Sequence, residues 1–163
     1  MFARTLLPLA FAAALAACGP SADQAAPAAE GAPTQQAAAA PSGPCDAPAV
    51  DAAIGANVSG TLEAAASYPD NATYYCVRVA EGTPRLTITL SGLSNDLDLY
   101  VGQGSIQSVQ GVDLEAGETY QWKSNEFGTV DERVVIENPQ AGIYYAEIVS
   151  YEGKQSPYQF SVQ

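Results

Sequence analysis

The chain has 163 residues, with 18 acidic and 6 basic side chains and a formal net charge of −12. Negative charge of this size repels nucleic acid and anionic lipid, which argues against both as binding partners of the folded part. The absence of histidine excludes Ser-His-Asp and Cys-His catalysis and the HExxH zinc motif. A hydrolase that works with two carboxylates is the enzyme class left open.

The N-terminus has the layout of a secretory signal peptide. Arg4 supplies a positive start, an apolar run covers residues 6–15, and two alanines precede Cys18. The apolar run is far shorter than the roughly 20 residues that a membrane-spanning helix needs. We therefore expect residues 1–17 to be removed during export.

The sequence Leu15-Ala16-Ala17-Cys18 resembles the lipobox of bacterial lipoproteins. The resemblance implies cleavage before Cys18, a diacylglycerol thioether on its sulfur and an acylated N-terminus, so that lipid makes the membrane a partner. Gly19 stands where an aspartate would retain an enterobacterial lipoprotein in the inner membrane, which favours the outer membrane. The alternative is a plain signal peptide that happens to be followed by cysteine.

Residues 18–44 comprise the lipidated cysteine and a segment of Ala, Pro, Gly, Gln and Ser. Its only charges are Asp23 and Glu30, and it has no apolar periodicity. Such composition predicts a disordered linker, in which prolines prevent the alanine run 37–40 from continuing as a helix. The linker separates the anchor from one folded domain, residues 45–163.

Cys45 and Cys76 are the two cysteines that remain once Cys18 carries lipid. An oxidising compartment outside the cytoplasm would let them form a disulfide that fixes the start of the domain to a strand. Free thiols or a metal site are the alternatives, and the lack of histidine gives the metal site little support.

The domain consists of short alternating segments separated by turns. In one of them Tyr75, Val77 and Val79 alternate with neighbours that include Cys76, which places Cys76 on the outer face of the strand. The expected strands lie within 57–62, 74–79, 85–90, 96–101, 118–123, 132–137, 143–150 and 157–162. About eight half-buried strands, with no convincing helix, predict an all-β, jelly-roll-like antiparallel β-sandwich.

Three runs in this region resemble the bacterial pre-peptidase C-terminal (PPC) domain. They are NDLDLYV at 95–101, DERVVI at 131–136 and NPQAGIYY at 138–145, followed by a turn that contains Tyr151 and by a last strand at 156–162. The resemblance covers about residues 57–163. It implies a jelly-roll sandwich, usually appended to secreted peptidases, that has no catalytic role and is linked to secretion, stability or substrate binding.

Asp96 and Asp98 form the sharpest local pair of polar side chains. Two residues apart on a strand, their carboxylates share a face and lie about 6–7 Å apart. Ca²⁺ would accept several oxygens there, with Asn95, Asp131 or Glu132 as further ligands. The alternative is that both aspartates cap neighbouring turns. No cofactor is required by the sequence, and Ca²⁺ is the one that the pattern suggests.

Aromatic side chains are the other candidate for binding. If they face outward, tyrosine and tryptophan can stack on sugars or anchor a peptide, because they combine apolar area with a polar tip. The residues expected on such an aromatic face are Tyr100, Trp122, Tyr145 and Tyr151, with Tyr74 and Tyr144 as further candidates. The alternative is that most of them pack at sheet edges and corners.

The sequence as a whole predicts a non-catalytic, lipid-anchored envelope protein. It would display a PPC-like sandwich that binds an extracytoplasmic protein or polysaccharide. One alternative is an accessory subunit that stabilises a secreted peptidase or hydrolase, or retains it at the membrane. A small hydrolase based on carboxylates is the other, and it would need carboxylates with raised pKa gathered in a concave site.

Overall fold

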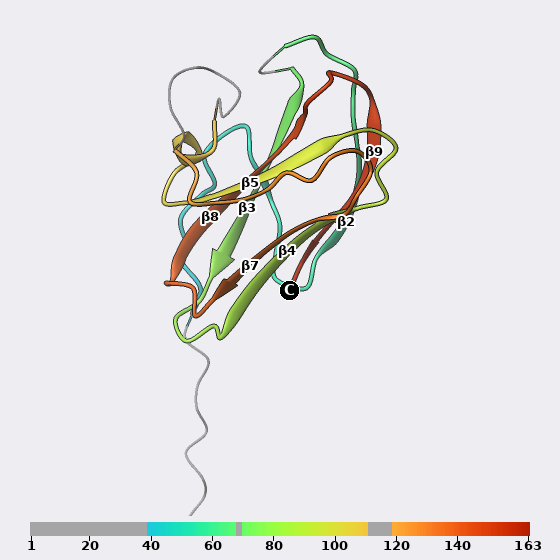
Figure 1. The fold of residues 1–163 in the computed structure, drawn as a ribbon. Helices are drawn as coiled ribbons and strands as arrows, with labels where there is room; N and C mark the ends of the chain where they lie inside the picture. The colour runs from blue at the N-terminus through green and yellow to red at the C-terminus, as the bar shows by residue number, and fades with distance from the viewer. Residues whose placement is uncertain (1–38, 68–69, 111–118) are drawn as a thin grey trace, which may run out of the picture. The chain divides into compact units, whose positions relative to one another are not determined.

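The computed structural model describes residues 39–67, 70–110 and 119–163 (Figure 1). The expected signal peptide, Cys18 and most of the linker lie outside these described residues. Within them, no helix has the length and apolar character needed to cross a membrane.

The described residues form nine β-strands in two sheets. The first sheet has the strand order β1-β3-β8-β5-β6 and the second has the order β2-β9-β4-β7. Their bounds are β1 Val50–Asp51, β2 Asn57–Leu62, β3 Ala72–Val79, β4 Arg85–Ser91, β5 Leu97–Gln103, β6 Trp122–Ser124, β7 Glu132–Glu137, β8 Gly142–Ser150 and β9 Ser156–Val162. All pairings are antiparallel except that of β1 with β3. The structure therefore confirms the all-β sandwich predicted from the alternation.

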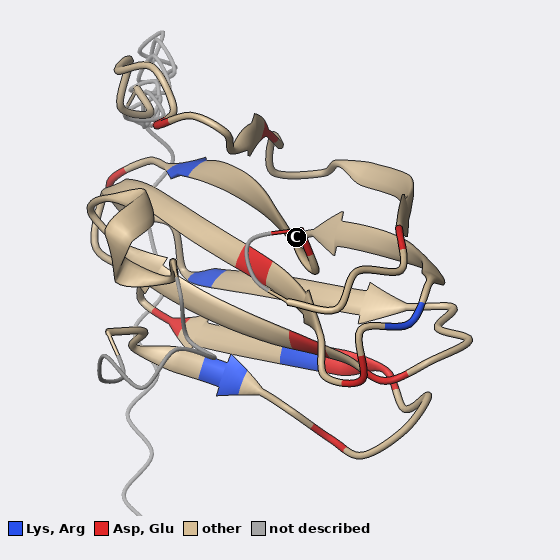
Figure 2. Cartoon of the chain, turned by 90° about the horizontal axis from the view of Figure 1, so that it is seen from above, with Lys and Arg blue, Asp and Glu red and all other residues tan. Residues whose placement is uncertain are grey.

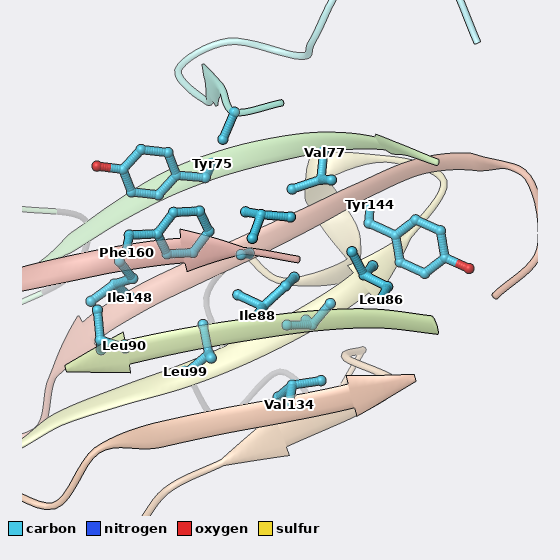
Figure 3. Close-up of a cluster of buried hydrophobic side chains, with 14 of the residues drawn as sticks. Tyr75, Val77, Leu86, Ile88, Leu90, Leu99, Val134, Tyr144, Ile148 and Phe160 are labelled. Atoms are coloured by element: carbon cyan, nitrogen blue, oxygen red, sulfur yellow. The ribbon is translucent and has the colours of Figure 1, made fainter. Parts of the chain in front are cut away.

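The core lies between the two sheets and is built from every second residue of the strands (Figure 3). Leu97, Leu99 and Val101 of β5 point into it, as their alternation predicts. The ring of Tyr75 stacks on that of Phe160, with 4.2 Å between ring centroids. The Tyr75 hydroxyl also forms a hydrogen bond of 2.9 Å with the Tyr158 hydroxyl, so this buried polar group has a partner.

Apart from shifts of one or two residues at strand ends, the expected strands differ from the observed ones at two places. Strand β6 covers only residues 122–124, whereas the sequence predicted 118–123. Strand β1 was not predicted, because two residues are too short to show alternation. A short 3-10 helix, η1 (Ile106–Ser108), follows β5.

The segment that enters the domain packs on the outer face of the first sheet, the face turned away from the second sheet. Cys45 and Cys76 are joined by a disulfide with 6.1 Å between their Cα atoms. The backbone N–H of Asp46 donates to the Tyr145 hydroxyl at 3.0 Å, and the Asp46 carboxylate accepts from the Ile106 N–H at 3.1 Å. Cys76 thus lies on the outer face, as predicted, but is buried there beneath this segment.

The Arg78 side chain adds a second attachment for the entering segment. Its guanidinium donates to the Gly43 carbonyl at 2.7 and 3.1 Å and forms an ion pair with Asp51 of β1. Together with the disulfide, these contacts fix the point at which the preceding chain leaves the sandwich.

Candidate binding site

A hollow of about 220 Å³ lies beside the start of β5 and is called here the acidic cup. Its walls come from the residue before β5, the outer face of β5, the loop after β6 and the turn after β8. The lining residues are Asp96, Asp98, Tyr100, Asn125, Glu126, Phe127 and Tyr151. Figure 2 marks the acidic and basic positions of the described residues. No lysine or arginine belongs to the lining among the residues that the structure describes.

The two aspartates predicted from their spacing both line the acidic cup. Asp98 belongs to β5 and faces away from the core, while Asp96 lies just before the strand. The Tyr100 hydroxyl donates to the Asp98 carboxylate at 3.5 Å, and the Tyr100 ring packs against Tyr120 with centroids 4.9 Å apart. Asp98 is thereby held within the packing of the outer face, whereas Asp96 belongs to the loop.

Two aromatic rings stand at the edge of the acidic cup. Phe127 is 90% exposed and Tyr151 is 71% exposed. A large ring that is this exposed gains little burial energy from folding, so it is available for a contact outside the chain. Phe127 lies in the loop after β6, a segment in which the sequence pattern indicates no site residue.

Glu132 lies close to the carboxylates of the cup and is fully buried. One of its carboxylate oxygens, Oε1, accepts the backbone N–H of Glu126 at 2.8 Å. The other oxygen, Oε2, is buried without a hydrogen-bond partner among the described residues, and the same is true of Oδ1 of Asp96. The alternation of β7, in which Val134 and Ile136 point inward, places Glu132 on the buried side.

The environment of Glu132 disfavours its charged form. Burial is the largest cause that raises the pKa of its carboxyl, and the nearby Glu126 and Asp96 carboxylates raise it further. Hydrogen bonds from the Ser124 hydroxyl and the Glu126 amide act in the opposite direction. The net result is a carboxyl that holds its proton more tightly than an exposed glutamate does.

Replacing Glu132 by glutamine is expected to weaken the pH dependence of stability. The folded carboxyl binds its proton more tightly than the unfolded one. Above pH 4.5, the ordinary pKa of this carboxyl, the folded state therefore binds more protons than the unfolded state. The free energy of unfolding therefore falls with rising pH, from 4.5 up to the raised pKa of the folded state. Glutamine does not titrate, so Glu132→Gln removes this part of the fall.

Denaturant unfolding of both proteins between about pH 4 and about pH 8 measures the difference. Glu137→Gln, on the exposed side of the same strand, is the control and should follow the parent protein. Identical pH profiles for the parent and Glu132→Gln would contradict the raised pKa.

The structure does not bring the four predicted aromatic residues to one exposed face. Tyr145 is buried under the entering segment, where its hydroxyl accepts the Asp46 N–H. Trp122 is half-buried beside Tyr144, with ring centroids 5.8 Å apart, and lines a different hollow together with Gln103 and Gln140. Of the four, only Tyr100 and Tyr151 line the acidic cup. The predicted aromatic face is corrected accordingly: strand alternation does not show what covers the outer face.

One group of three potential metal ligands is found among the described residues. It consists of Cys45, Asp51 and Cys76, whose ligand atoms lie within 4.8 Å of one another. Both sulfurs belong to the disulfide and Asp51 pairs with Arg78, so this group is not a metal site. The carboxylates of the acidic cup do not reach this spacing.

Calcium binding at Asp96 and Asp98 stays a prediction. Of the additional ligands considered for it, Asn95 donates its side-chain amide to the Gln155 carbonyl at 2.6 Å, and Asp131 is exposed outside the cup. Glu132 is the one that lies near the pair.

Comparison with known proteins identifies the family that the middle of the domain matches. The model of the bacterial pre-peptidase C-terminal domain matches residues 71–150. Among solved structures, the chain is similar to the pre-peptidase C-terminal domain of a collagenase from Bacillus anthracis, with 16% identity and a TM-score of 0.49 over 76% of this chain and 100% of that one. No curated protein matches the sequence. Residues 71–150, which contain β3 to β8 and most of the acidic cup, thus carry the pattern of the bacterial pre-peptidase C-terminal domain, a non-catalytic domain of peptidases.

Proposed function

We propose that this protein is a non-catalytic, lipid-anchored envelope protein whose sandwich binds an extracytoplasmic protein or polysaccharide. The observation that carries the proposal is the acidic cup with its two exposed rings, Phe127 and Tyr151. Exposed aromatic rings beside polar groups are typical of surfaces that contact a ligand, because the rings supply apolar area and the polar groups set orientation.

The proposed location rests on the N-terminal sequence and agrees with the disulfide. A lipid on Cys18 would hold the chain at the membrane, and the linker up to residue 44 would extend the sandwich away from it. The disulfide between Cys45 and Cys76 is the kind of bond that persists outside the cytoplasm. Gly19 supports the outer membrane as the site of the anchor.

Replacing Cys18 by alanine tests the anchor. In bacteria fed a radioactive fatty acid, the parent chain is expected to carry label and to fractionate with the membrane, because thioether lipid forms only on the cysteine sulfur. Cys18→Ala is expected to lose the label, whereas Ser21→Ala, a change just beyond the lipobox, keeps it. A parent chain without label would contradict the lipid anchor. In an enterobacterial host, Gly19→Asp should move the chain to the inner membrane.

The family match favours a second candidate function, that of an accessory subunit for a secreted peptidase. The family is named for domains of peptidases, and a domain of this kind on a separate anchor could retain such an enzyme at the membrane. Deleting the chain should then shift peptidase activity from the membrane fraction to the medium. An unchanged distribution of activity would contradict this second candidate and leave the first intact.

A further inference from the structure

The charges around the acidic cup favour a cation as ligand. Asp96, Asp98 and Glu126 line the hollow, Glu132 is buried nearby, and no basic side chain belongs to the described lining. The chain as a whole carries a net charge of −12. A hollow surrounded by charge of one sign concentrates ligands of the opposite sign.

Two carboxylate oxygens at this place lack the hydrogen bonds that buried acceptors normally have. They are Oε2 of Glu132, whose residue is 0% exposed, and Oδ1 of Asp96. The Glu132 carboxylate points toward the cup loop, because its Oε1 accepts the N–H of Glu126. Since buried acceptors are almost always paired, the Asp96 oxygen, whose residue lines the cup, favours a ligand that donates hydrogen bonds.

The size of the cup favours an organic cation over a bare metal ion as the ligand. A calcium ion draws six to eight oxygens to about 2.3–2.6 Å, so its ligand atoms must converge on one point. No three carboxylates of the cup have oxygens within 4.8 Å of one another, a spacing that Cys45, Asp51 and Cys76 do reach. The cup carboxylates instead border a hollow of about 220 Å³. A planar guanidinium, with five N–H donors in a fixed fork, matches carboxylates that stand apart.

The aromatic rings give a second reason to choose arginine. Phe127 and Tyr151 are 90% and 71% exposed at the edge of the same hollow. A guanidinium stacks on aromatic faces, and its methylene stem covers apolar surface. A calcium ion would leave both rings without a contact, whereas an arginine side chain entering the cup would use them.

We propose that the acidic cup binds an arginine side chain of a basic partner protein. This inference rests on the proposed binding function and assigns the ligand to proteins rather than to polysaccharides. Asp96 and Glu126, which line the cup, accept from the guanidinium, while Phe127 and Tyr151 contact its stem and its planar face.

Titration of the full-length chain in detergent micelles with the peptide acetyl-Gly-Arg-Gly-amide tests the proposal. In ¹⁵N-resolved NMR spectra, saturable shifts are expected at the amides of residues 96–98 and 125–127. The same peptide with citrulline, which has the shape of arginine without its charge, should bind about tenfold or more weakly, because charge-assisted hydrogen bonds are lost.

Matched variants distinguish the cup from the general negative charge of the chain. Glu126→Gln and Asp96→Asn should each weaken binding of the arginine peptide by about tenfold. Glu81→Gln and Asp70→Asn remove the same charge at exposed positions outside the cup and should change affinity by less than about twofold. Equal losses in all four variants, or equal binding of the citrulline peptide, would overturn the proposal.

Two further titrations separate this inference from the other ligands considered. Calcium chloride that shifts the same amides at saturation and displaces the arginine peptide would make the cup a metal site and overturn the proposal. The proposal would also be overturned if a neutral hexasaccharide of glucose shifted these amide signals and the arginine peptide had no effect on them. That result would leave the proposed function standing, with a polysaccharide as the ligand.

Discussion

Replacing Phe160 by alanine is expected to lower the free energy of unfolding by about 4 kcal/mol. Phe160 lies on β9 in the middle of the core and is fully buried. Its ring is almost parallel to that of Tyr75, at 11° and 4.2 Å, so that it joins the two sheets directly (Figure 3). Removing the ring takes away this stacking and leaves a cavity that a two-sheet core can close only in part.

Denaturant unfolding of the full-length chain, followed by the fluorescence of its single tryptophan, measures this loss. Phe127→Ala is the matched control, because it removes the same side chain from a position that is 90% exposed. The control should change the free energy of unfolding by less than about 0.5 kcal/mol. A loss below about 1 kcal/mol for Phe160→Ala would mean that the two sheets do not pack as described.

Removing the disulfide is expected to have the next largest effect. The bond joins residues 31 positions apart, and closing a loop of that length in the unfolded chain is worth about 3.7 kcal/mol in the chain-entropy treatment. The double variant Cys45→Ser, Cys76→Ser should therefore unfold about 15 °C below the parent protein. The contacts of Arg78 with Gly43 and Asp51 are expected to hold the entering segment less firmly once the covalent link is gone.

Thermal unfolding with and without a reducing agent supplies the test of the disulfide. The reducing agent should lower the unfolding temperature of the parent protein to that of the double variant, and should leave the double variant unchanged. A parent protein that reduction does not affect would show that the two cysteines do not form the bond.

Phe160→Ala and the removal of the disulfide act on different faces of the first sheet. Phe160 packs on the face that meets the second sheet, whereas the disulfide joins the entering segment to the outer face. The acidic cup lies beside the outer face of β5, with loop residues as its other walls. Variants such as Glu126→Gln should therefore alter binding while leaving the core intact, which makes binding and stability separable in this protein.

The amino-acid sequence by itself determined most of the strands and which side of each of these is apolar. The side-chain period of two is a local property, so Leu97, Leu99 and Val101 could be assigned to the core without knowing their neighbours. The same alternation put Cys76 on the outer face, where the structure joins it to Cys45. The order and spacing of the runs near Asp96 and Asn138 were enough to indicate a resemblance to the pre-peptidase C-terminal domain, whose model matches residues 71–150.

The tertiary structure decided what covers each face and which loops meet. Tyr145 alternates like an exposed residue, but the entering segment and η1 bury it. Asp96, Glu126 and Tyr151 approach one another only because β5 pairs with both β6 and β8. Pairing between distant strands depends on the packing of the whole core rather than on any local pattern. Strand alternation therefore found the two aspartates, with Glu132 among the residues that could join them, and only the fold showed that Glu126 and Phe127 line the same hollow.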